Sequence, residues 1–276
     1  MIIARIRTLA LAVVASFAAM DGARSADLPL MPPPPDFSGW YLRGDIGFTN
    51  QSVDSLFNSN YSGFLSVSNV DKGFDAAPLF GLGVGYTFNN WLRVDVTGEY
   101  RGNATFHGLD VGALPAPAGA FASDRYIASK SEWLFLVNGY VDLGTWWNIT
   151  PFIGAGVGAS RNTISNFGDF SACVNSAACS GSDAYANSAS KWNFAWALHA
   201  GLAYQIWRNA TIELSYRYVD LGDAQSGDLI VFTGTNNFYN PMEFNHLTSH
   251  DVRLGMRFLL GAPDYAPPPP PLRSKG

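Results

Sequence analysis

The chain has 276 residues, a formal net charge of −5 and only 14% charged residues, against roughly 25% in ordinary soluble domains. An acidic chain of this kind gives no reason to expect nucleic-acid binding. Aromatic residues also make up 14% of the chain, a level that favours use at a membrane interface.

The N-terminus has the pattern of a secretory signal peptide, predicted over 1–25. Arg5 and Arg7 precede an apolar run over 9–20, and Ala23-Arg24-Ser25 is a small-x-small cleavage site before Ala26. A transmembrane anchor is the alternative, but the apolar run is too short for one, and no other run approaches ~18 apolar residues. The chain is therefore expected to be periplasmic, secreted or an outer-membrane barrel.

Proline-rich stretches flank the body of the chain. They predict an extended linker over 26–38 and an extended tail over 261–276, on either side of a predicted barrel domain over 39–260.

Between these stretches, alternation of apolar and polar residues predicts eight strands. In 251–258, for example, Val252 and Leu254 lie on one face while Asp251 and Arg253 lie on the other. The predicted strands cover 40–48, 78–88, 91–101, 132–142, 151–161, 191–206, 211–220 and 251–258.

The connections between these strands alternate in length. Long loops are expected over 49–77, 102–131, 162–190 and 221–249, and short turns over 89–90, 143–150 and 207–210. Short periplasmic turns with long external loops are typical of outer-membrane barrels. A soluble sheet also shows alternation, but it does not explain alternating loop lengths or aromatic residues at the strand ends. An all-β, eight-stranded, antiparallel up-and-down transmembrane barrel is the predicted fold.

The two cysteines, Cys173 and Cys179, lie in one polar segment, and in an exported protein this spacing predicts a disulfide. A metal site would need further Cys or His nearby, so no metal is expected. No cofactor motif is present, because the Gly-x-Gly runs lie inside strands. Catalysis is not expected either: His199 has no serine on its face, and the other histidines lie in or beside the long loops.

Several segments resemble the alphaproteobacterial outer-membrane β-barrel proteins, often called outer-membrane immunogenic or porin-family proteins. These segments are Ala26-Asp27-Leu28-Pro29, 37–42 (FSGWYL), 213–222 (ELSYRYVDLG) and 250–258 (HDVRLGMRF). The resemblance implies an eight-stranded barrel in the outer membrane, with both termini in the periplasm. Members commonly end on the aromatic residue of the last strand, which serves as a signal to the barrel-assembly machinery, whereas this chain continues past Phe258. The resemblance also implies that the processed terminus, Ser25 to Ala26-Asp27, tethers the chain to peptidoglycan; an untethered linker is the alternative.

An eight-stranded barrel has an interior just wide enough for side chains to fill it. The alternation predicts a charged set that faces the lumen and must be paired or wet: Arg43, Asp45, Arg93, Asp95, Glu99, Arg101, Glu213, Arg217, Asp251, Arg253 and Arg257. We expect these charges to form a structural network that fills the lumen. The predicted function is therefore structural: the barrel contacts outer-membrane lipid, stabilises the envelope and displays surface loops. The alternatives are a small channel or porin through the same charges, and a receptor or adhesin that acts through its loops.

Overall fold

The computed structural model describes residues 38–115, 119–175, 183–234, 236 and 238–260. The predicted signal peptide, the tether residues, Cys179 and the proline-rich tail lie outside these residues, so those expectations stay predictions. Within the described part of the chain, no helix is long and apolar enough to span a membrane.

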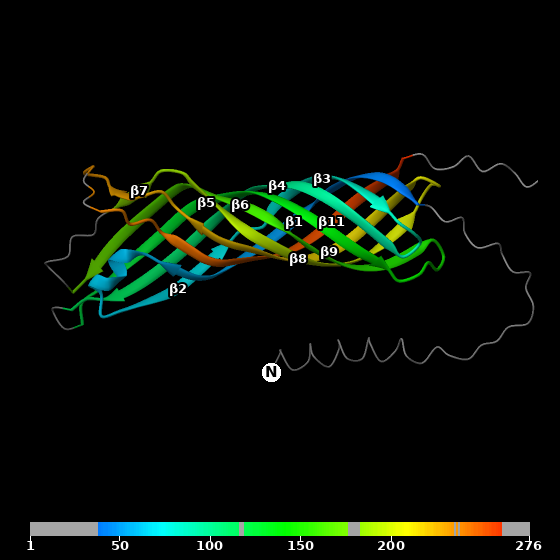
Figure 1. Ribbon diagram of the computed structural model, residues 1–276. Coiled ribbons are helices and arrows are strands. Elements are labelled where there is room, and N and C mark those ends of the chain that lie inside the picture. The colour runs from blue at the N-terminus through cyan, green and yellow to red at the C-terminus, as the bar shows by residue number, and fades with distance from the viewer. Residues whose placement is uncertain (1–37, 116–118, 176–182, 235, 237, 261–276) are drawn as a thin grey trace, which may run out of the picture. The chain divides into compact units, whose positions relative to one another are not determined.

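Eight antiparallel strands close into a ring (Figure 1). They are β1 (Gly39–Phe57), β3 (Ala77–Thr87), β4 (Leu92–Ala113), β5 (Phe121–Asp142), β6 (Ile149–Val174), β8 (Ala189–Gln205), β9 (Ala210–Gln225) and β11 (Glu243–Leu259). Each pairs with the next ring strand along the chain, and β11 returns to pair with β1. This closure leaves the ring without a free edge and confirms the predicted eight-stranded barrel.

Shorter elements lie at one end of the ring. β2 (Ser66–Phe74) pairs with β4, β7 (Ala184–Ala186) pairs with β6, β10 (Leu229–Val231) pairs with β7, and a 3-10 turn, η1, covers Ser59–Gly63. We call this end the loop end; β2 and β7 mark it in Figure 1. The opposite end holds the short connections and is called the turn end. Tyr41 pairs there with Leu259, so both ends of the ring's chain lie at the turn end.

A band of apolar side chains covers the outside of the ring on the turn-end side. Large side chains there lie on the surface, as Phe48, Leu82 and Phe194 illustrate with exposed fractions of 68%, 74% and 67%. An apolar surface that runs around a whole barrel is the surface that meets lipid. We call this part of the barrel, with its lumen, the membrane segment.

The strands continue well beyond the apolar band, and the prediction of four long loops is wrong in this respect. β4 extends to Ala113 and β6 to Val174, whereas the predicted strands end at 101 and 161. We call the described parts of 49–77, 102–131, 162–190 and 221–249 the projecting segment. Its outward side chains include Ser129, Thr163 and Ser165 beside exposed apolar ones such as Leu65 and Val70, so its outer face is mixed and does not continue the apolar band.

Bulges also interrupt the two-residue period at the border between the segments. The register shifts between Arg101 and Ala104 in β4, and between Ser165 and Gly168 in β6, opposite Ile127 and Ser129 of β5. A bulge inserts one residue and moves every later side chain to the other face. Consequently Phe106 is buried inside the barrel, although the alternation of the preceding strand would place it outside.

Candidate functional site

The lumen of the membrane segment is filled by ion pairs that cross from strand to strand. Near the turn end, Arg43 lies 2.7 Å from Asp45 and 2.8 Å from Asp95. Arg93 lies 3.2 Å from both Asp142 and Glu213. These guanidinium groups thus join β1, β4, β5 and β9 across the interior.

A second group of ion pairs lies closer to the loop end. Arg101 is fully buried, and its three guanidinium nitrogens lie 2.8 Å from Glu99, 2.9 Å from Glu132 and 2.5 Å from Asp251. Arg217 binds Glu99 and lies 2.8 Å from Asp251. Arg101 therefore neutralises three carboxylates that arrive from three different strands.

The structure brings the predicted charged set together in the lumen. Arg253 is the exception to the ion pairing, because no described carboxylate lies within 4 Å of it; it donates instead to Nδ1 of His199 at 3.1 Å. His199 Nε2 lies 3.1 Å from Asn138 Oδ1, and the Asn138 amide donates to Asp95 at 2.8 Å. Arg253 is thus tied to the network through a neutral histidine and an amide.

Three lumen charges were missed from the sequence. Lys130 binds Glu132 and lies 2.7 Å from Gln51, and Asp142 pairs with Arg93. Lys130, Glu132 and Asp142 all lie on the face opposite Trp133. Strict alternation over 132–142, extended by two residues to Lys130, could therefore have identified all three. With these three, seven basic side chains face seven acidic ones: Arg43, Arg93, Arg101, Lys130, Arg217, Arg253 and Arg257 against Asp45, Asp95, Glu99, Glu132, Asp142, Glu213 and Asp251.

Glycines on the lumen side provide the room that this network needs. A Cβ on Gly85 would overlap the ring of Tyr41, and a Cβ on Gly156 would overlap the amide of Asn138. Tyr41 and Asn138 both donate to Asp95, at 3.0 and 2.8 Å. The small residues of β3 and β6 therefore let long polar side chains from β1 and β5 cross the lumen.

An apolar layer closes the lumen above the ion pairs, inside the projecting segment. Phe106 lies between Phe74 and Phe244, with ring centroids 5.0 and 4.9 Å away, and Phe167 lies 6.4 Å from Phe244. These four phenylalanines come from β2, β4, β6 and β11, and all are buried. We call this group the phenylalanine plug.

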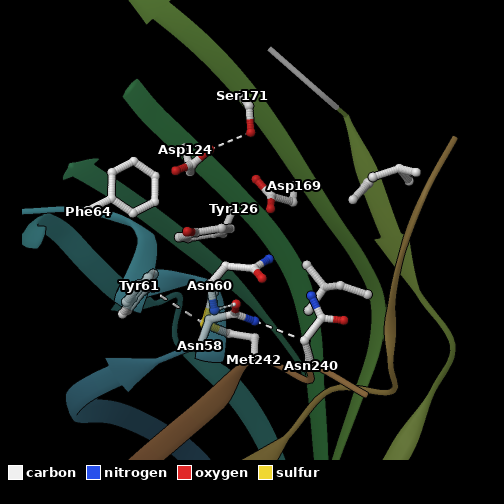
Figure 2. A pocket seen from close by; sticks show the side chains of 13 residues that line it. Asn58, Asn60, Tyr61, Phe64, Asp124, Tyr126, Asp169, Ser171, Asn240 and Met242 are labelled. Atoms are coloured by element: carbon white, nitrogen blue, oxygen red, sulfur yellow. Dashed lines mark hydrogen bonds between the residues drawn. The ribbon is translucent and has the colours of Figure 1, made fainter. Parts of the chain in front are cut away.

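Beyond the phenylalanine plug, a cavity of about 180 Å³ lies at the loop end, as Figure 2 shows. Asn58 and Tyr61 of the η1 region line one side, and Tyr126 and Asp169 of β5 and β6 line another. The Asn58 amide donates to the backbone oxygen of Asn240 at 2.9 Å, which fixes the η1 region to the segment before β11. We call this cavity the loop-end pocket.

The loop-end pocket is acidic. Tyr61 donates to Asp110, Ser171 donates to Asp124, and Oδ1 of Asp169 is buried without a hydrogen-bond partner among the described residues. Burial, together with the charges of Asp124 and Asp110, raises the pKa of Asp169 to about 8. Burial also raises the pKa of Asp124. The pocket therefore suits a group that supplies positive charge and hydrogen-bond donors.

Other predicted sites are only partly within the described chain. Cys173 lies near the end of β6, and its predicted partner, Cys179, lies outside the described residues, so the disulfide stays a prediction. His107 and His246, expected in or beside loops, lie within β4 and β11. Among the described residues, no group of three or more His, Cys, Asp or Glu side chains is placed to hold a metal ion.

Several known proteins are similar to this chain. An uncharacterised protein of Brucella abortus strain 2308 is 29% identical over 255 residues, covering 82% of this chain and 86% of that protein. A candidate adhesin of Rickettsia bellii strain OSU 85-389 is 30% identical over 224 residues, covering 79% and 87%. The outer membrane protein PagN of Salmonella typhimurium is 29% identical over 199 residues, covering 67% and 75%.

Among solved structures, Neisserial surface protein A matches with 16% identity and a TM-score of 0.42, covering 81% of this chain and 98% of that chain. OprG from Pseudomonas aeruginosa matches with 13% identity and a TM-score of 0.40, covering 81% and 97%. The model of the outer membrane protein β-barrel domain matches residues 9–258. Given the closed eight-stranded ring, its apolar band and this match, the chain belongs to the outer membrane protein β-barrel family.

Proposed function

We propose that this outer-membrane protein is a sealed structural barrel that stabilises the cell envelope and displays its projecting segment at the cell surface. The observation that carries the proposal is the filled interior, in which ion pairs and the phenylalanine plug occupy successive levels. A barrel that only needs to anchor in lipid gains from such filling, whereas a pore needs a continuous water path.

The same filling argues against the small channel. Arg101 and Arg217 are held by carboxylates on both sides, and a permeating ion would have to break these buried pairs. We also propose a role without catalysis, inserted by the barrel-assembly machinery, because the buried charges pair with one another rather than facing an open cleft.

The proposed orientation places the loop end at the cell surface and the turn end in the periplasm. Long projections outside and short turns inside are the usual arrangement of outer-membrane barrels. An epitope tag between β10 and β11 should bind antibody on intact cells, and a tag after residue 276 should bind only after permeabilisation. The opposite labelling would overturn the proposed orientation but would leave the proposal of a sealed lumen unaffected.

The structural role is tested in cells that lack the chain. Such cells should become sensitive to detergent and leak periplasmic enzyme, and expression of the wild-type chain should restore resistance. A variant lacking only residues 229–239 should restore resistance equally, since the eight ring strands are intact. Failure of the wild-type chain to restore resistance, or full envelope integrity without it, would contradict the proposal.

A surface receptor or adhesin is the second candidate, and the loop-end pocket favours it. The pocket is acidic and faces the end proposed to lie outside the cell. One relative in Rickettsia bellii carries the name of a candidate adhesin, and this supports the proposal. Cells that carry the wild-type chain should bind host-cell surfaces better than cells in which Asp124 and Asp169 are both replaced by Asn, while the variant still folds. Equal binding would exclude the pocket as the adhesive site.

A further inference from the structure

The outer face of the barrel carries an arginine at the border between the membrane and projecting segments. Arg161 of β6 pairs in register with Trp133 of β5 and Trp192 of β8, so all three side chains share one outward row. The two tryptophans are 45% and 59% exposed, and Arg161 is exposed between them. This row is where the apolar band ends.

Arg161 has no acidic neighbour on this face. The outward positions next to it hold Trp133, Trp192, Ala159 and Thr163, and among the described residues no carboxylate lies within ion-pair distance of it. Two other cations on the outside of the barrel have partners: Lys191 lies 3.1 Å from Asp223, and Arg125 lies over the ring of Phe170. At the edge of the lipid-facing band such a guanidinium costs little, because it can reach the level of the lipid headgroups, and with no acidic neighbour it is free to bind an anion there.

The next outward row towards the loop end supplies hydroxyl groups. Ser131, Thr163 and Ser190 pair with one another in register, directly above Trp133, Arg161 and Trp192. The hydroxyls of Thr163 and Ser190 lie 2.9 Å apart and are exposed. Two residues along a strand is a step of roughly 6.6 Å, so the guanidinium and these hydroxyls can reach one group of phosphate size.

The aromatic side chains of this row and of the next row towards the turn end form a wall that fixes the site in depth. Trp133 stacks on Phe135 at 6.1 Å, and Phe135 stacks on Trp192 at 6.3 Å, across the small side chain of Ala159. Tryptophan rings prefer the level of the lipid headgroups. The wall therefore places Arg161 at the height where headgroup phosphates lie.

We propose that Arg161, with the hydroxyls of Ser131, Thr163 and Ser190, binds a phosphoryl group of an anionic membrane lipid. A planar guanidinium binds phosphate oxygens through paired hydrogen bonds, and the hydroxyls complete the set of donors. In the proposed orientation this lipid is the phosphorylated glycolipid of the outer leaflet. The proposed orientation decides only which leaflet supplies the lipid. The binding of a phosphoryl group follows from the side chains and does not depend on the orientation.

The test uses the whole folded protein in a neutral detergent, where both rims of the barrel are accessible whatever its orientation in cells. Lipid A is added, and native mass spectrometry measures the fraction of protein that retains it; phosphatase-treated lipid A is the second arm. Wild-type protein should retain lipid A about tenfold better than the dephosphorylated lipid, as expected for charge-assisted hydrogen bonds to phosphate.

Arg161→Gln should abolish this preference, while the matched variant Arg125→Gln, which removes an exposed arginine farther from the apolar band, should keep it. Both substitutions face outward, so the gel-shift signature of the folded barrel should be unchanged. Equal retention of both lipids by wild type, or equal losses in Arg161→Gln and Arg125→Gln, would overturn the proposal.

Discussion

The membrane and projecting segments are built from the same strands but have opposite distributions of polar groups. In the membrane segment, Leu82 and Phe194 face outward while Arg93 and Arg101 are buried inside. In the projecting segment, Ser129 and Ser165 face outward while Phe106 and Phe244 are buried inside. The outer medium decides this difference, since lipid accepts apolar side chains and water accepts polar ones.

This reversal determines how each segment closes its interior. Charges inside the membrane segment must be paired, because the strands have already given their apolar side chains to the lipid. The projecting segment can place phenylalanines in its interior, because its outer face does not have to be apolar throughout. Two unrelated kinds of packing thus close one lumen, and substitutions should separate them.

The largest effect is expected at Arg101. Arg101→Leu leaves Glu99, Glu132 and Asp251 without their shared cation, and breaking a buried ion pair on one side costs about 3–5 kcal/mol. The free energy of unfolding in urea, with the barrel in lipid vesicles, measures this loss. Arg257→Leu is the matched control, because Arg257 is partly exposed and lies 3.5 Å from Glu213; an equal loss there would contradict the special position of Arg101.

Charges placed on the outer face should distinguish the two segments directly. Val84 faces outward between Leu42 and Val96, so Val84→Arg should destabilise the barrel by about 2–4 kcal/mol, as for an arginine near the middle of the bilayer. Ser129→Arg, on the outside of the projecting segment, should change stability by less than about 0.5 kcal/mol. Similar losses in both variants would mean that the apolar band does not mark the border with lipid.

The loop-end pocket predicts a dependence of stability on pH. Asp169 binds its proton more tightly in the folded chain, because its pKa is raised from 3.8 to about 8. Its stabilising contribution is therefore fully present below pH 3.8 and is lost as the pH rises to about 8. The melting temperature should therefore decline as the pH rises, and Asp169→Asn should flatten this decline. The control Asp71→Asn, on an exposed part of β2, should leave the decline unchanged. An unchanged decline in Asp169→Asn would contradict the raised pKa of the buried Asp169 carboxyl.

The smallest effect is expected at Arg253. No carboxylate of the described residues lies within 4 Å of its guanidinium, and its contact to His199 is a hydrogen bond to a neutral ring. Arg253→Met should therefore change the free energy of unfolding by no more than about 1 kcal/mol, since replacing a buried cation by an apolar side chain is often neutral. A loss as large as that of Arg101→Leu would show that the network depends on long-range charge rather than on direct pairs.

The sequence predicted the membrane segment well and the projecting segment poorly, for a physical reason. In 251–258, apolar and charged residues alternate strictly, so the strand and the direction of Arg253 and Asp251 could be read directly. Past the apolar band, Ser129 and Thr163 replace apolar side chains on the outer face, and the bulge between Arg101 and Ala104 reverses the alternation. The loop-end pocket could not be predicted, because Asp124 and Asp169 meet only through the pairing of β5 with β6.

The conductance of the folded barrel in a planar lipid bilayer tests the sealed lumen most directly. Folding is verified by the gel shift before insertion, and the wild-type protein is recorded beside a double variant, Arg101→Ala with Phe244→Ala, that removes one side chain from each closing layer. We expect no resolved current steps for the wild type. Reproducible steps from verified wild-type barrels, altered by replacement of Arg93 or Arg253, would contradict the sealed lumen and make the protein a channel.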